Sequence, residues 1–253
     1  YVGESEKNLR EVFEKVRRIG EGILFFDEID AFFYDNLEKG FLDLKAFEKL
    51  AKRKTVIPIS ENIGKGSLRQ LAHNVVDPHI WFDVSLWKYA VKNVQSHLVR
   101  LDSINADFYN ANATKYLKSL DSLHQTVKEQ ISEIPQNQRM LITAHDAFGY
   151  FGDAYDIEVK GLQGISTLSE PGLKDVADLV NLIADNKIKA IFIETSVSKK
   201  AINAVVEGCK DIGHEVVIGG SLYSDAMGEF GTSDGTYIGM VHANVAQIVN
   251  ALQ

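Results

Sequence analysis

Apolar residues along the chain follow two spacings, and the two alternate from one end to the other. Over residues 9–19 they recur every three or four positions, which predicts a helix with one buried face. The short apolar run at 23–26 has the pattern of a buried parallel strand. A helix is then predicted around 44–52 and a strand at 55–59. Helices and strands that alternate in this way predict an α/β protein.

The middle of the chain predicts two longer helices. The first follows Asp83, whose side chain can cap a helix start. The second is predicted over about 108–132, and Pro135 ends it. At about 1.5 Å per residue the second helix would reach roughly 35 Å, which is enough to cross a whole domain.

The alternation of strands and helices restarts beyond this long helix. Ser169 and Pro171 predict the start of one helix, by the cap and first-turn rules. The other elements predicted here are strands at 140–143, 157–159, 190–193 and 215–218, and a closing helix at 237–252.

This order of elements predicts an α/β fold in three parts. They are an N-terminal lobe over residues 1–107, a linking helix over 108–134 and a C-terminal lobe over 135–253. Each lobe is expected to contain a parallel sheet.

Composition and charge exclude several classes of partner. The 253 residues carry a formal net charge of −8, which argues against nucleic acid or an anionic membrane and weakly favours a cation as ligand. Cys209 is the single cysteine, so neither an intrachain disulfide nor a cysteine-rich metal site is expected. The chain starts at Tyr1 without Met or signal peptide, so we expect it to be expressed in the cytoplasm.

Three segments place a side chain that can bind metal just beyond a predicted strand or turn. They present His79, His145 and Asp225. Ligands of parallel sheets bind beyond the carboxyl ends of the strands, so His145 and Asp225 are expected at one edge of the second lobe. His79 is expected to come from the first lobe, across a cleft. Imidazole and carboxylate together favour Zn²⁺, Mn²⁺ or Fe²⁺ over Ca²⁺ or Mg²⁺.

Each of these residues also has an ordinary structural explanation. A histidine beside a proline, such as His79, is commonly a loop or packing residue. Asp225 lies near glycines and can be a turn former. His145 and Asp146 can cap a helix, with the carboxylate at the positive end of the helix dipole. Spacing alone therefore leaves both interpretations open.

Five segments in order along the chain narrow this choice. They read DPHIWFD, TAHDAFGYF, EVKGLQGIST, AIFIETS and GGSLYSDAMG. Together with the long helix containing NANATKYLKSLDSL, they closely resemble the zinc and manganese solute-binding proteins of ABC importers, the cluster A-I metal-binding family. The resemblance covers about residues 43–253.

The resemblance implies a binding protein rather than an enzyme. The second, third and fourth metal ligands of the family fall on His79, His145 and Asp225, and histidine at the third position is typical of zinc binders, with Mn²⁺ as an alternative. Outer-shell roles are implied for Asp146 and Glu194, either of which could orient an imidazole. The alternative for Glu194 is a carboxylate at a strand end that caps the next helix. A monomer that delivers its metal to a membrane permease outside the cytoplasm is also implied.

The N-terminal segment departs from this family. The histidine segment that carries the first ligand is absent, and residues 1–30 instead resemble an AAA+ ATPase from the pore loop to the Walker B strand, with Asp27 and Glu28 as its acidic pair. Residues 64–67 lack the spacing of a phosphate loop, so no nucleotide is expected to bind. We interpret the chain as a chimera: a truncated first lobe completed by a grafted helix–strand unit, joined between about residues 27 and 43.

The absence of the first ligand predicts a metal affinity below that of an intact family member. Water, or a carboxylate among Asp27, Glu28 and Asp30, could take the fourth position, with His73 as a further candidate. The alternative hypothesis is an engineered scaffold that was built from two α/β fragments and has no biological activity.

Overall fold

The computed structural model describes residues 58–71, 76–164, 171–195 and 197–253. The chain divides into two compact units, residues 1–50 and 51–253, and every described residue belongs to the second. The predictions for the segment before residue 58, including the AAA+-like helix and strand and the junction, lie outside the described residues. So do His73 and Ser169.

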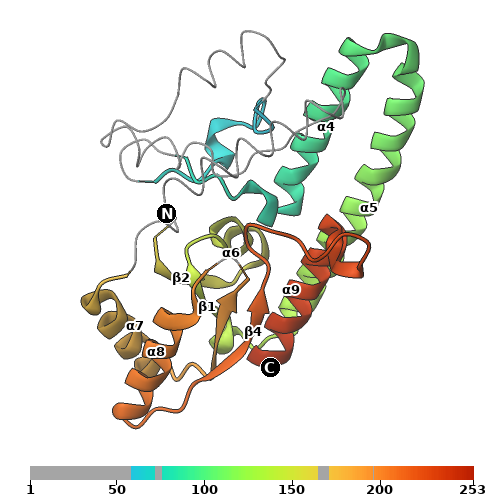
Figure 1. Ribbon diagram of the computed structural model, residues 1–253. Coiled ribbons are helices and arrows are strands. Elements are labelled where there is room, and N and C mark those ends of the chain that lie inside the picture. The colour runs from blue at the N-terminus through green and yellow to red at the C-terminus, as the bar shows by residue number, and fades with distance from the viewer. Residues whose placement is uncertain (1–57, 72–75, 165–170, 196) are drawn as a thin grey trace, which may run out of the picture. The chain divides into compact units, whose positions relative to one another are not determined.

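Two long helices form an antiparallel pair. Helix α4 (Val84–Leu101) is joined to α5 (Ala106–Ser132) through the short turn η4 (Ser103–Asn105), and the two lie side by side (Figure 1). The predicted cap is confirmed: Asp83 Oδ1 accepts the Ser85 N–H at 2.7 Å. Among the described helices, none combines the length and the apolar character needed to cross a membrane.

In the described part of the chain, four parallel strands pair as two two-stranded sheets that lie in one layer. Strand β1 (Met140–His145) pairs with β2 (Glu158–Gln163), and β3 (Ala190–Glu194) pairs with β4 (Val217–Leu222). Strands β1 and β3 lie side by side, so the layer runs β2, β1, β3, β4. All four strands were predicted from sequence, and each ends one to four residues later than expected. The α/β class with parallel strands is therefore confirmed.

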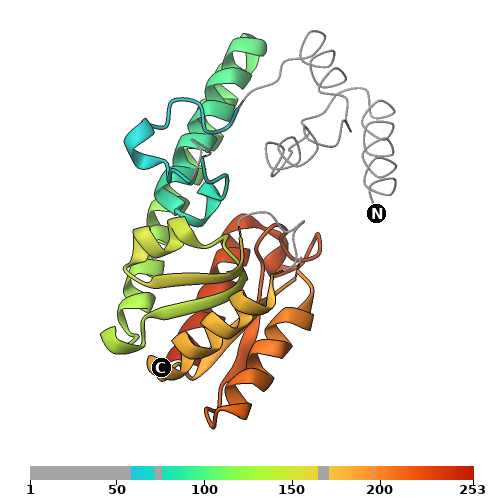
Figure 2. The ribbon, with the colours of Figure 1, turned by 90° about the vertical axis from the view of Figure 1, so that its left-hand side faces the viewer.

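Helices cover both faces of this layer. Helices α7 (Leu173–Asp185) and α8 (Lys199–Asp211) cover one face, and α9 (Tyr237–Leu252) with α5 covers the other (Figure 2). The central strands β1 and β3 bury side chains on both faces, because successive side chains point in opposite directions. Leu141 accordingly joins the core under α5 and α9, whereas its neighbour Ile142 joins the core under α7 and α8.

The predicted start of α7 is wrong. The helix begins at Leu173 with Gly172 as its N-cap, one residue beyond Pro171. The Gly172 N–H donates to Asp175 Oδ2 at 2.8 Å, so an acidic side chain in the first turn returns to the cap and fixes the helix start.

Short elements complete the described chain. They are the 3₁₀ turns η1 (Lys65–Ser67), η3 (Ile80–Phe82), η5 (Gln136–Gln138) and η6 (Ser233–Gly235), and helix α6 (Gly149–Tyr155). The division into two lobes and a linking helix stays a prediction.

Candidate metal centre

His145 is the last residue of β1 and is held by the end of the neighbouring strand. Its side chain is fully buried, and Nδ1 lies 2.6 Å from Glu194 Oε2, at the end of β3. The other oxygen, Glu194 Oε1, accepts the backbone N–H of His145 at 2.8 Å. A carboxylate can only accept, so Nδ1 carries the hydrogen and Nε2 is left to face a ligand.

Close approach of the edge strand shapes the turn after His145. A Cβ at Gly161 of β2 would lie 2.5 Å from the Asp146 backbone nitrogen, so only glycine fits there without a shift. The Thr143 hydroxyl donates to the His145 carbonyl at 2.8 Å. Backbone packing therefore fixes the histidine from the side opposite Glu194.

His79 lies in a loop, yet its ring is held in the same way. It is the N-cap residue of η3 and is fully buried. Asp77 Oδ1 lies 2.8 Å from His79 Nδ1 and also accepts the His79 backbone N–H at 3.0 Å. The hydrogen again belongs on Nδ1, and Nε2 again faces away from the supporting carboxylate.

Asp225 follows β4 in a loop that is fixed on two sides. Asn244 of α9 accepts the Tyr223 N–H at 2.9 Å and donates to the Tyr223 carbonyl at 2.8 Å. Trp81 Nε1 donates to the Ser224 carbonyl at 3.1 Å. The segment after His79 is thus bonded directly to the segment before Asp225.

The three side chains converge on one point. Asp225 Oδ1 lies 3.6 Å from His145 Nε2 and 4.0 Å from His79 Nε2. One atom from each residue that can bind a metal lies within 4.8 Å of the others. Two ligands bonded to one tetrahedral Zn²⁺ at 2.0–2.1 Å are about 3.3 Å apart. A contraction of up to about 1.5 Å would therefore bring all three into bonding distance.

Charge at this point comes from carboxylates on both sides of His145. Burial lowers the pKa of His145, but contacts with Asp225 and Glu194 outweigh it and raise the pKa to about 10. The imidazole is therefore protonated at neutral pH when no cation is bound. A divalent cation at the same point would provide the positive charge in place of the proton.

Comparison with known proteins gives the family. The family described as "ZnuA: Zinc-uptake complex component A periplasmic" matches residues 26–251. The chain belongs to this ZnuA family. The matched range starts earlier than the resemblance at about residue 43 and leaves the first 25 residues outside it.

Named relatives and a solved structure agree with this family. The manganese-binding lipoprotein MntA of Bacillus subtilis is 46% identical over 207 residues, which are 81% of this chain and 68% of that protein. The zinc-binding protein TroA of Treponema pallidum is 44% identical over 208 residues, 82% of this chain and 68% of TroA. The structure of periplasmic zinc-binding TroA superposes with a TM-score of 0.80, covering 83% of this chain and 76% of that chain.

The loop that carries His79 in this ZnuA-family chain packs on helices and loops from the C-terminal half. Phe82 stacks on Phe148 with ring centroids 4.1 Å apart, and the Tyr237 hydroxyl donates to the Trp81 carbonyl at 2.7 Å. The Tyr150 hydroxyl of α6 donates to the Asp77 carbonyl at 2.9 Å. His79 is therefore held by the same framework that holds His145 and Asp225.

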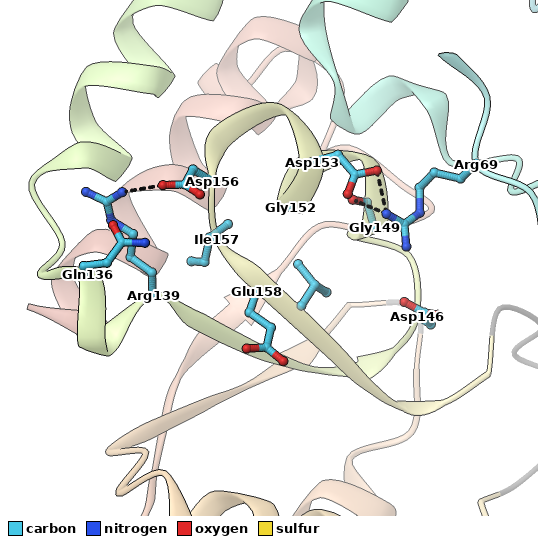
Figure 3. Close-up of a pocket in the computed structure, with 11 residues that line it drawn as sticks. Arg69, Gln136, Arg139, Asp146, Gly149, Gly152, Asp153, Asp156, Ile157 and Glu158 are labelled. Carbon is cyan, nitrogen blue, oxygen red and sulfur yellow. Dashed lines mark hydrogen bonds and ion pairs between the residues drawn. The ribbon is translucent and has the colours of Figure 1, made fainter. Parts of the chain in front are cut away.

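The two carboxylates expected behind the imidazoles, Glu194 and Asp146, lie in different surroundings. Glu194 contacts His145 as a supporting carboxylate. Asp146 instead lines a groove of about 500 Å³ beside Arg69, where burial and the charge of Asp77 raise its pKa (Figure 3). Asp77 was missed, although it stands two residues before His79 in the DPH segment. No sequence signal pointed to Arg69.

Proposed function

We propose that this chain binds a transition-metal ion as cargo and is the solute-binding component of a metal ABC importer. His79, His145 and Asp225 are the proposed ligands. The observation that carries the proposal is the convergence of two buried imidazoles and one carboxylate within 4.8 Å, each imidazole supported by a buried carboxylate.

The donor set favours Zn²⁺, with Mn²⁺ as the second candidate. Two imidazole nitrogens and one carboxylate oxygen suit borderline ions, whereas Ca²⁺ and Mg²⁺ prefer sites made of oxygen. The names of the relatives are consistent with both ions, because TroA is named as zinc-binding and MntA as manganese-binding.

Delivery to a membrane permease follows from the family. A protein that carries cargo must release it, so a site with three protein ligands and one open position is suited to transfer. We propose that the chain acts as a monomer, outside the cytoplasm, and has no catalytic role. Family membership supports this assignment.

We also propose that the affinity is below that of a family member with four protein ligands. The described residues supply three ligands, and water would take the fourth position. Asp27, Glu28, Asp30 and His73 remain candidates for that position and lie outside the described residues. A carboxylate there would shift the preference toward Mn²⁺.

Equilibrium dialysis with elemental analysis tests the function. The chain is expected to retain one Zn²⁺ per molecule, and less Mn²⁺ under the same conditions. His145→Ala is expected to lose the zinc, because two ligands do not hold an ion against dialysis. Zinc retained at full stoichiometry by His145→Ala would move the site elsewhere and refute the assignment.

The AAA+-like interpretation of residues 1–30 remains a separate prediction. It expects no ATP hydrolysis, because the chain has no phosphate loop to hold the β- and γ-phosphates. A phosphate-release assay tests it. Hydrolysis that is lost in Glu28→Gln would contradict it and would reopen the question of a nucleotide site.

A further inference from the structure

Arg69 contacts both segments that carry the histidines. Its contacts form a closed ring with Asp77 and Tyr150. The Arg69 carbonyl accepts the Asp77 N–H at 3.0 Å, and Arg69 Nε lies 3.6 Å from Asp77 Oδ2. Arg69 also donates from its backbone N–H to the Tyr150 hydroxyl at 3.0 Å. That hydroxyl in turn donates to the Asp77 carbonyl. Burial raises the pKa of Tyr150 to about 12, so the hydroxyl keeps its proton.

The guanidinium extends this ring to the helix that follows His145. Arg69 Nη1 donates to the Gly149 carbonyl at 3.2 Å and pairs with Asp153 Oδ2 at 2.6 Å, both in α6. One side chain therefore touches the carboxylate behind His79 and the helix that starts four residues after His145. Arg69 therefore connects the two segments that carry the imidazoles.

A second arginine in the same groove provides a natural comparison. Arg139 lies at the opposite end from Arg69 (Figure 3). It pairs with Asp156 Oδ2 at 3.0 Å and donates to the Ile134 carbonyl at 2.9 Å. Both arginines thus combine an aspartate with backbone carbonyls. Only the contacts of Arg69 lead to a residue that supports a proposed metal ligand.

We infer that Arg69 is a positioning residue for the metal site, acting through Asp77 on His79 and through α6 on His145. The inference rests on the proposed function. Asp77 Oδ1 makes two contacts with His79, and Oδ2 is paired electrostatically with Arg69 Nε at 3.6 Å, so Arg69 restrains the other side of the carboxylate. A loose Asp77 would leave the His79 ring free to rotate, and a tetrahedral ion tolerates little rotation of its ligands.

The experiment compares Arg69→Met with Arg139→Met, each in the full chain. Zn²⁺ affinity is measured by competition with a chelating dye, and the geometry is monitored by the visible absorption of bound Co²⁺. We expect Arg69→Met to weaken Zn²⁺ binding about tenfold and to change the Co²⁺ spectrum. Arg139→Met should bind as the parent chain does. Arg69→Lys keeps the charge but loses the planar fork, and should fall between the two.

The outcomes separate this inference from the proposed function. If the parent chain itself binds no Zn²⁺, the proposed function fails. If the parent binds but Arg69→Met and Arg139→Met match it within twofold, with identical Co²⁺ spectra, Arg69 is structural only and the inference is overturned. If Arg69→Met does not fold, Arg69→Lys decides: parent-like affinity and spectrum in that variant overturn the inference, and a weaker, altered site supports it.

Discussion

The two histidines of the site have the same chemistry but differ in how the fold holds them. His145 ends a strand in the sheet layer, and its supporting carboxylate, Glu194, ends the adjacent strand. His79 lies in a loop, and its supporting carboxylate, Asp77, lies in the same loop. Backbone pairing therefore places the first pair, whereas side chains from distant segments must place the second.

The difference shows two ways to orient an imidazole. At a strand end, the neighbouring strands fix the backbone on both sides, so the sheet itself sets the direction of the His145 side chain. A loop gives no such direction, so Arg69, Tyr150 and Trp81 supply bonds that a sheet would otherwise provide. If this distinction controls stability and metal binding, substitutions at the two histidines should have unequal effects.

The largest expected effect is on the stability of the metal-free protein. His145→Ala leaves Glu194 buried without the imidazole, and breaking a buried pair in this way costs about 3–5 kcal/mol. His79→Ala should cost less, because Asp77 keeps Arg69 within 3.6 Å. Urea unfolding of both variants measures the difference. Equal losses would mean that the two carboxylates are supported alike.

Metal-dependent stabilisation should disappear in both histidine variants. An ion that binds only the folded state stabilises it by about 2.7 kcal/mol at a hundredfold excess over its dissociation constant. Thermal unfolding of the parent with and without Zn²⁺ should show this rise, and either substitution should remove most of it. An undiminished rise in His79→Ala would show that the loop histidine is not a ligand.

Substitution of a supporting carboxylate should lower the metal affinity less than substitution of a ligand does. Glu194→Gln keeps the size of the side chain but weakens its hold on the His145 ring, and an outer-shell change of this kind typically costs about 10–100-fold in metal affinity. Competition titration with a zinc dye measures it. Asp175→Asn, which changes a carboxylate at the start of α7, is the matched control and should bind as the parent does.

The last effect concerns pH, and it is the smallest when it is counted per pH unit. In the metal-free protein the carboxylates raise the pKa of His145 to about 10, above its unfolded value of about 6.5. The stabilisation from this ion pair is complete below pH 6.5 and is lost as the pH rises through 10. An incoming metal must displace the proton, so affinity should rise about tenfold per pH unit from pH 6 to 8. A plateau above pH 7 would contradict the raised pKa.

Much of the framework could be predicted because it depends on local pattern. The apolar segments between helices predicted every strand in the described part. Because these strands are parallel, the ends of β1 and β4 lie at one edge of the layer. His145 and Asp225 were expected together for that reason, and they lie 3.6 Å apart. The start of α7 was missed because a return bond from Asp175, and not a proline, fixes it.

The loop side of the site could not be predicted in the same way. Arg69 lies eight residues before Asp77, and its aspartate partner, Asp153, lies 84 residues away. No spacing rule links these positions, because the contacts exist only after the loop has packed on α6. Asp77 stands two residues before His79 in the sequence. Its support of the imidazole depends on the direction in which the His79 ring points, and the sequence does not show that direction.

Zinc-edge anomalous diffraction tests most directly whether one ion is shared by the three side chains. Crystals of the full chain grown with Zn²⁺ are predicted to show a single strong anomalous peak about 2.0–2.2 Å from His79 Nε2, His145 Nε2 and Asp225 Oδ1. The supporting contacts of Asp77 and Glu194 should be retained. A zinc peak bound elsewhere, with the two imidazoles and Asp225 still more than 3.5 Å from it, would contradict the account.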